Sequence, residues 1–314
     1  MTYQFIKIDK RLTYDPGHTV KVTYMGKTRR ITTTKLPMHP GTVNIDKDHY
    51  MVISTGEIKR KHHTENRSEN LIGIRRSLSH VQDLIDCNVT DGSRCRWLTL
   101  TYRLMPDGSP MTDTAKLQHD WDIFLKRFKR YCKSHQLETP EYICVAEPQG
   151  SGAWHMHVIF VYQNKAPYLP SEDIEALWGQ GFVKVKAVKD KDNIGAYFAA
   201  YLTDISVEDY LDDDTQTLKQ VELIDHVVTD EKGNHIKKKF IKGGRLQFYP
   251  VGFNCVRHSR GLKYPEAVKM TNEEADISIR SEFDLVYRSD VEVVTTSDKR
   301  GNTITKEVYR DNKE

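Results

Sequence analysis

The chain of 314 residues lacks long apolar runs, and no segment approaches the roughly 18 apolar residues of a membrane-spanning helix. The first residues, Met1-Thr2-Tyr3-Gln4, also lack the apolar stretch of a signal peptide. Hydrophobic residues make up 38% and charged residues 29% of the sequence, which is enough apolar material for a folded core. We therefore expect a globular, cytoplasmic protein with no membrane partner.

Paired cysteines are also missing. The sequence has five cysteines and no CxxC spacing, which argues against a disulfide framework and against a cysteine-rich zinc module. No Gly-rich phosphate loop followed by Lys-Ser or Lys-Thr occurs, so no P-loop helicase domain is fused to this chain. Any chemistry must therefore come from other side chains.

Charge is unevenly distributed along the chain. The net formal charge is +3, but residues 203–231 contain ten acidic residues and one lysine. The rest of the chain is therefore basic, as a protein that binds phosphate groups needs to be. A solvated surface without such a partner explains the charges equally well.

Hydrophobic periodicity predicts an α+β fold. Short alternating stretches predict a β-rich region over residues 1–54, and helical spacing follows over 66–86. The next elements alternate in the order β-α-β-β-α-β-α, which predicts a central antiparallel sheet flanked by helices. Their ranges are 96–102, 114–134, 141–147, 153–162, 171–178, 182–188 and a last helix from Asp192 or Asn193 to Leu202.

Four segments follow from these patterns. Residues 1–92 form a β-rich and helical N-terminal region, a candidate accessory for DNA binding, and residues 93–205 form the core. Residues 206–236 are an acidic linker or insertion, with a hairpin turn expected at 229–234. Residues 237–314 form a basic C-terminal region that packs on the core, and its polar tail is expected to be partly flexible.

The strand around residues 153–162 carries the most informative motif, His155-Met156-His157. Side chains alternate along a strand, so His155 and His157 point to one face. Glu147 ends the preceding strand, and a Gly-rich turn can bring its carboxylate beside both rings. Two nitrogens and one carboxylate oxygen suit Mn²⁺ or Mg²⁺. The alternative is a pair of surface histidines on an edge strand.

A second motif lies in the helix predicted to end near Leu202. Tyr197 and Tyr201 are four residues apart and therefore share a helical face. A tyrosine oxygen beside a bound phosphate can act as a covalent nucleophile. Taken alone, such a pair is more often two tyrosines that pack against a sheet.

Together, the strand Trp97–Tyr102, the His-Met-His strand and the tyrosine helix resemble the three motifs of HUH endonucleases, in the order found in rolling-circle replication initiators of small plasmids and phages. The resemblance covers residues 94–205. It implies an RRM-like or ferredoxin-like core with N- and C-terminal extensions. It also implies His155, His157 and Glu147 as metal ligands and Tyr201 and Tyr197 as nucleophiles.

The resemblance further implies metal-dependent nicking and joining of single-stranded or hairpin origin DNA through a 5′-phosphotyrosine, with a host helicase as partner. Relatives often have a lysine three residues after each tyrosine, where this chain has Ala200 and Asp204. Basic residues elsewhere are candidates for binding DNA phosphates. They are Lys126, Arg127, Arg130, Lys184, Lys186, Lys189, Lys191 and Arg245.

Two alternatives remain open at this point. A transposase or conjugative relaxase would use a related site, although relaxases usually carry a third histidine and an N-terminal tyrosine. A sheet-based nucleic-acid-binding module would have no catalytic activity, and its sheet would present aromatic side chains where this chain presents histidines.

Overall fold

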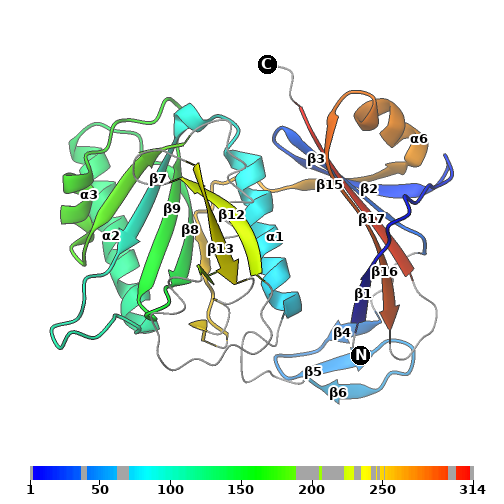
Figure 1. Ribbon diagram of the computed structural model, residues 1–314, viewed down its shortest axis with the longest axis horizontal. Coiled ribbons are helices and arrows are strands. Elements are labelled where there is room, and N and C mark those ends of the chain that lie inside the picture. The colour runs from blue at the N-terminus through cyan, green and yellow to red at the C-terminus, as the bar shows by residue number, and fades with distance from the viewer. Residues whose placement is uncertain are drawn as a thin grey trace. The chain divides into compact units, whose positions relative to one another are not determined.

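The computed structural model describes residues 3–36, 41–61, 71–188, 205–206, 223–229, 235–241, 245, 248–250, 252–295 and 302–311. The chain divides into two compact units (Figure 1). Unit 1 combines Met1–His63 with Tyr264–Glu314, and unit 2 is Thr64–Lys263. This division differs from the four sequence-based segments, because strands from the two ends of the chain pair with each other.

Unit 2 contains a five-stranded antiparallel sheet in the order β10-β7-β9-β8-β14. Its central strand β9 lies between β7 and β8, so two neighbours fix its register. The bounds of the strands are Cys95–Thr101 for β7, Glu141–Pro148 for β8, Trp154–Val161 for β9, Val183–Ala187 for β10 and Val256–His258 for β14. The α+β content with an antiparallel sheet agrees with the sequence-based expectation.

Helix α2 (Thr114–Ser134) covers one face of this sheet. Asp113 caps it by accepting hydrogen bonds from the backbone of the first turn. Its aromatic side chains pack on the sheet, since the ring of Phe128 stacks on Phe160 of β9 at 4.5 Å between centroids. Phe160 lies on the same face of β9 as Met156 and Val158, so α2 covers the face that the histidines do not occupy.

The other helices of unit 2 are α1 (Leu71–Asn88), the 3-10 turn η2 (Gly92–Arg94) and α3 (Ser171–Trp178). The predicted helix 114–134 and the neighbouring predicted strands are confirmed, with ends within about two residues. A separate three-stranded sheet has the order β11-β13-β12, with bounds Ile205–Ser206, His235–Ile241 and Leu223–Thr229. The antiparallel pairing of β12 with β13 confirms the predicted hairpin.

Unit 1 contains a six-stranded antiparallel sheet in the order β1-β16-β17-β3-β2-β15. Its strands are Tyr3–Lys7 (β1), Thr19–Met25 (β2), Thr28–Thr34 (β3), Glu266–Thr271 (β15), Asp284–Thr295 (β16) and Asn302–Arg310 (β17). Helix α6 (Asn272–Ala275) and the π-helical turn η4 (Asp276–Arg280) contribute Ala275 and Ile279 to a core with Val20, Val22 and Ile31.

A smaller sheet of unit 1 has the order β4-β5-β6, with bounds Thr42–Asn44, His49–Val52 and Ile58–Arg60. Strand β17 pairs with both β16 and β3. The polar composition predicts a partly flexible tail there, but the structure places these residues inside the sheet. Among the helices that the structure describes, none has both the length and the apolar character needed to cross a membrane.

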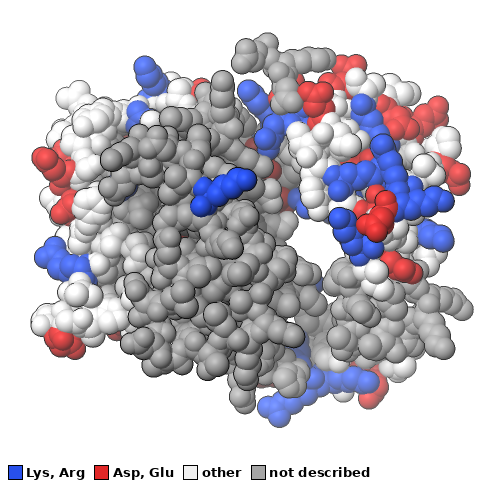
Figure 2. All heavy atoms as spheres, in the orientation of Figure 1, with Lys and Arg blue, Asp and Glu red and all other residues white. Residues whose placement is uncertain are grey.

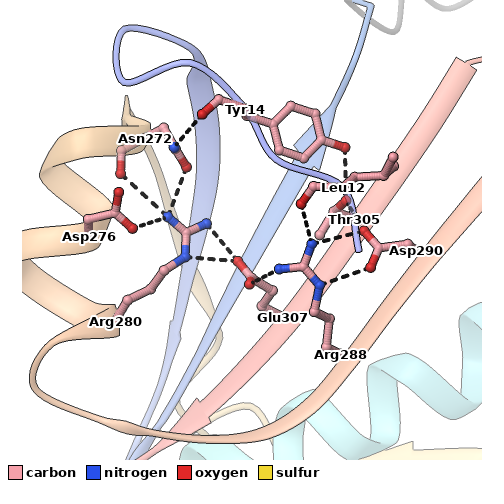
Figure 3. A network of polar contacts seen from close by, with 9 residues as sticks. All are labelled: Leu12, Tyr14, Asn272, Asp276, Arg280, Arg288, Asp290, Thr305 and Glu307. Carbon is pink, nitrogen blue, oxygen red and sulfur yellow. Dashed lines mark hydrogen bonds and ion pairs between the residues drawn. The ribbon is translucent and has the colours of Figure 1, made fainter. Parts of the chain in front are cut away.

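A network of charged side chains joins the C-terminal elements of unit 1 (Figure 3). The buried carboxylate of Glu307 accepts from Arg280 at 2.6 Å and from Arg288 at 2.5 Å. Arg288 also binds Asp290 at 2.9 Å, and Arg280 binds Asp276 at 2.7 Å. Two arginines therefore hold one buried acid.

Candidate functional site

The register of unit 2 places the predicted metal-binding residues on one face of the sheet. Glu147 of β8 lies directly opposite His155 of β9, and His157 lies one residue pair further along. The Oε2 atom of Glu147 is 2.6 Å from Nε2 of His157. The rings of His155 and His157 are 6.3 Å apart between centroids. The structure therefore brings Glu147 and His157 into contact, with His155 beside them.

The site is largely removed from solvent. Glu147 is 3% exposed and His157 is 7% exposed, while His155 is half-buried. Burial raises the pKa of the Glu147 carboxyl, but Arg245 and then His157 lower it by more, so its pKa lies below the usual value. Glu147 is therefore an anion near neutral pH, which is the form that a divalent cation requires.

Arg245 supplies the main positive charge of the site. Its Nη1 is 2.6 Å from Oε1 of Glu147 and donates a hydrogen bond to the carbonyl of Pro148 at 2.8 Å. The residue is 5% exposed. The sequence suggests Arg245 as a DNA-binding residue, but its guanidinium contacts the candidate metal ligand. Its contact with DNA stays an untested prediction.

Strand β7 supports His157 from the other side. Thr99 lies opposite His157, with 3.4 Å between Oγ1 and Nδ1, and the ring of Trp97 meets the imidazole edge to face at 6.1 Å. A hydrogen-bonding partner on one ring nitrogen orients the other nitrogen toward a ligand. The sequence analysis missed Thr99, although the alternation of Trp97, Thr99 and Thr101 on one strand face contains the signal.

The donor types fit a divalent cation. Two imidazoles and a carboxylate anion are a set that binds Mn²⁺ well, and the low pKa of Glu147 keeps the carboxylate ready. Among the residues that the structure describes, however, no three His, Cys, Asp or Glu side chains are grouped as a metal-binding cluster. The donors thus share one face without forming a preassembled three-ligand cage.

The predicted nucleophiles and two of the basic candidates lie outside the described residues. They are Tyr197, Tyr201, Lys189 and Lys191, together with the helix predicted to carry the tyrosines. The structure therefore leaves the tyrosine assignment as a prediction.

The remaining basic candidates lie on different sides of the sheet. Lys126, Arg127 and Arg130 belong to α2, which covers the face away from the histidines, and Arg127 donates to the carbonyl of Leu177 at 3.1 Å. Lys184 of β10 lies opposite Thr99, in the same cross-strand row as His157.

Lys186 follows Lys184 on the same strand face, and both side chains are exposed. Burial and then the charge of Lys184 lower the pKa of Lys186. The structure therefore separates these two lysines, on the histidine face, from the bases of α2.

Comparison with known proteins supports an association with replication. Residues 95–206 match a family model described as Replication-associated protein ORF2. The matched segment begins at β7 and ends at β11, so it contains both histidines and Glu147. No curated protein and no solved structure gives a significant match to the chain.

Proposed function

We propose that this chain is a rolling-circle replication initiator that cuts and rejoins single-stranded origin DNA with a tyrosine and a divalent metal. One observation carries the proposal. The segment that matches a replication-associated family presents His155, His157 and the Glu147 anion on one face of its sheet.

The residues of this chain would have distinct roles. His155, His157 and Oε2 of Glu147 would hold Mn²⁺ or Mg²⁺, and the bound ion would polarise a DNA phosphate and stabilise its developing charge. Arg245 would keep Oε1 of Glu147 occupied, so that one oxygen remains for the ion. Thr99 would orient the His157 ring through Nδ1.

Tyr201 or Tyr197 would supply the nucleophile. The tyrosine oxygen would attack phosphorus, forming a 5′-phosphotyrosine bond and breaking the bond to the 3′ oxygen. That oxygen would take up a proton and leave as a free 3′-OH, which can prime synthesis. We assign the first cut to Tyr201 and the closing step to Tyr197.

Lys184 and Lys186 fit the role of phosphate-binding residues near the cut. Both lie on the histidine face, and strands are spaced about 4.8 Å apart, so β10 lies about 10 Å from β9. Each lysine is a flexible point charge that suits a phosphate oxygen. They would supply the positive charge that relatives obtain from a lysine after each tyrosine.

The proposal is tested with the full chain and a labelled single-stranded origin oligonucleotide. Incubation with Mn²⁺ should give a covalent protein–DNA adduct on a denaturing gel, and EDTA should prevent it. His157→Ala should abolish the adduct, whereas His135→Ala, an exposed histidine after α2, serves as the matched control and should leave it unchanged.

Three tyrosine variants complete the test, since Tyr→Phe removes only the hydroxyl. Tyr201→Phe should lose the first-cut adduct, and Tyr197→Phe should keep it. The reverse pattern would exchange the two roles. An adduct that persists in the double Phe variant would disprove the tyrosine mechanism, and binding without any adduct would favour a non-catalytic module.

A further inference from the structure

Unit 1 carries a row of lysines across one face of its six-stranded sheet. Lys269 of β15 pairs with Lys21 of β2, Lys21 with Thr32 of β3, Thr32 with Lys306 of β17, and Lys306 with Ser289 of β16. We call these five positions the lysine row. Every position is therefore a lysine or a hydroxyl residue. Lys21 and Lys269 are exposed, and Lys306 and Thr32 are partly exposed.

The opposite face of the same sheet treats charge differently. It packs Val20, Val22 and Ile31 into the core. Its arginine, Arg288, lies between two acids, Glu307 and Asp290. The sheet thus neutralises the charge that it buries and concentrates positive charge on the face with the lysine row.

The lysine row carries an energetic cost within the fold. Like charges directly opposite each other on an antiparallel pair are destabilising by roughly 0.2–1 kcal/mol. Lys21 and Lys269 are such a pair. A polyanion bound over the row would remove this repulsion, so the arrangement fits a ligand better than it fits stability alone.

We propose that the lysine row is a docking surface for the phosphate backbone of double-stranded DNA. Adjacent strands are about 4.8 Å apart, so the row spans about 14 Å from Lys269 to Lys306. Lysines on flexible stems can each reach a phosphate within that span. Surfaces for single strands add aromatic side chains for base stacking, whereas this row holds lysine, threonine and serine.

The charge of the surrounding surface agrees with this partner. Arg30 lies on the same face as Lys21, since it pairs with Thr23 two residues further along β2. On the side in view, Figure 2 shows Lys and Arg side chains gathered over unit 1. Clustered positive charge raises the local concentration of a polyanion and speeds its association.

The inference rests on the proposed function only for the choice of DNA as the polyanion. The site in unit 2 would act on an unpaired strand, and the row in unit 1 would hold flanking duplex. The two surfaces can therefore be tested separately, because one gives an adduct and the other gives equilibrium binding.

The test compares two double variants of the full chain with equal changes in charge. Lys21→Gln/Lys269→Gln removes the like-charge pair, and Lys47→Gln/Lys59→Gln removes two exposed lysines of unit 1 outside the row. Fluorescence anisotropy measures binding to a labelled duplex and to a single strand of equal length, with EDTA and over a range of salt.

We expect the row variant to bind duplex roughly tenfold more weakly, with a shallower salt dependence. The slope of log K against log salt should fall by about 1.8, which is about 0.9 for each lost phosphate contact. Single-strand binding, adduct formation and the control variant should remain close to wild type. The thermal midpoint should stay equal or rise, because a repulsion is removed.

Unchanged duplex binding, or equal losses in both variants or on both DNAs, would overturn the inference. If the row variant is thermally destabilised, Lys21→Arg/Lys269→Arg decides the matter. It should bind duplex like the wild type, and a loss there would also overturn the inference. Loss of the adduct with duplex binding intact would instead contradict the proposed function alone.

Discussion

Two buried glutamates, one in each unit, show how similar residues serve different purposes. Glu307 in unit 1 is 1% exposed, and Arg280 and Arg288 bind one oxygen each. Glu147 in unit 2 is 3% exposed, but only Oε1 binds an arginine, and Oε2 faces the imidazole of His157.

The difference lies in the second partner. An arginine stays protonated and always compensates the carboxylate, so Glu307 is committed to the fold. A histidine can be neutral and can bind a metal through the same nitrogen that faces the acid. Glu147 therefore has one oxygen committed to structure and one available for chemistry. The following predictions test this contrast, from the largest expected effect to the smallest.

Glu307→Gln should destabilise unit 1 by about 3–5 kcal/mol, because it leaves two arginines with too little negative charge. Chemical denaturation of the full chain measures the loss. Glu266→Gln on β15 of the same sheet is the control, since Glu266 is exposed and should cost little. Equal losses in the two variants would mean that the buried network does not stabilise this unit.

Arg245→Met should destabilise unit 2 by about 3 kcal/mol, because it leaves the buried Glu147 anion without its main cation. Mn²⁺ should restore part of that loss, since a bound divalent ion supplies positive charge at the other oxygen. At one hundred times the dissociation constant, the gain is about 2.7 kcal/mol.

Arg288→Met in unit 1 is the matched comparison for Arg245→Met. It should lose stability through the same loss of a buried cation, but Mn²⁺ should not restore it, because no histidine faces Glu307 or Asp290 among the described residues. Thermal unfolding with and without Mn²⁺ measures both. Equal rescue, or rescue of neither variant, would remove the contrast between the two acids.

Thr99→Val should weaken Mn²⁺ binding about tenfold, at the low end for a residue that orients a ligand, because its contact with Nδ1 of His157 is long at 3.4 Å. Isothermal titration with Mn²⁺ measures the change. Thr101→Val, opposite His155 on the same strand, is the comparison. A tighter site in the Thr99 variant would exclude an orienting role for its hydroxyl.

Acid should weaken unit 1 through Asp290. Burial raises the pKa of this carboxyl, but hydrogen bonds from Arg288 and Thr305 lower it by more, so the folded pKa lies below the usual value. The stabilisation is then complete above about pH 4, the usual unfolded value, and is lost as pH falls through the lower folded pKa. Stability measured against pH should show this loss in the wild type and lack it in Asp290→Asn.

Much of unit 2 could be predicted from local sequence patterns. Helix 114–134 has a complete apolar stripe and an Asp113 cap, and the spacing from Glu147 to His155 corresponds to a short hairpin between two strands. Alternation along β9 places both histidines on one face whatever the rest of the chain does. These features depend on neighbours within about ten residues.

Contacts between distant segments could not be predicted in the same way. Arg245 reaches Glu147 from almost one hundred residues away, and its basic surroundings in the sequence resemble an exposed DNA-binding stretch. Likewise β17 pairs with β3 across most of the chain, and alternation alone does not identify the partner of a strand. The lysine row appears only once that register is known.

Pulsed electron paramagnetic resonance of Mn²⁺ bound to the full chain tests the central claim most directly, because it detects nitrogen ligands of the ion without requiring activity. The account predicts coupling to two imidazole nitrogens in the wild type and to one in His155→Ala or His157→Ala. Mn²⁺ bound without any histidine nitrogen coupling would contradict a metal centre at His155, His157 and Glu147.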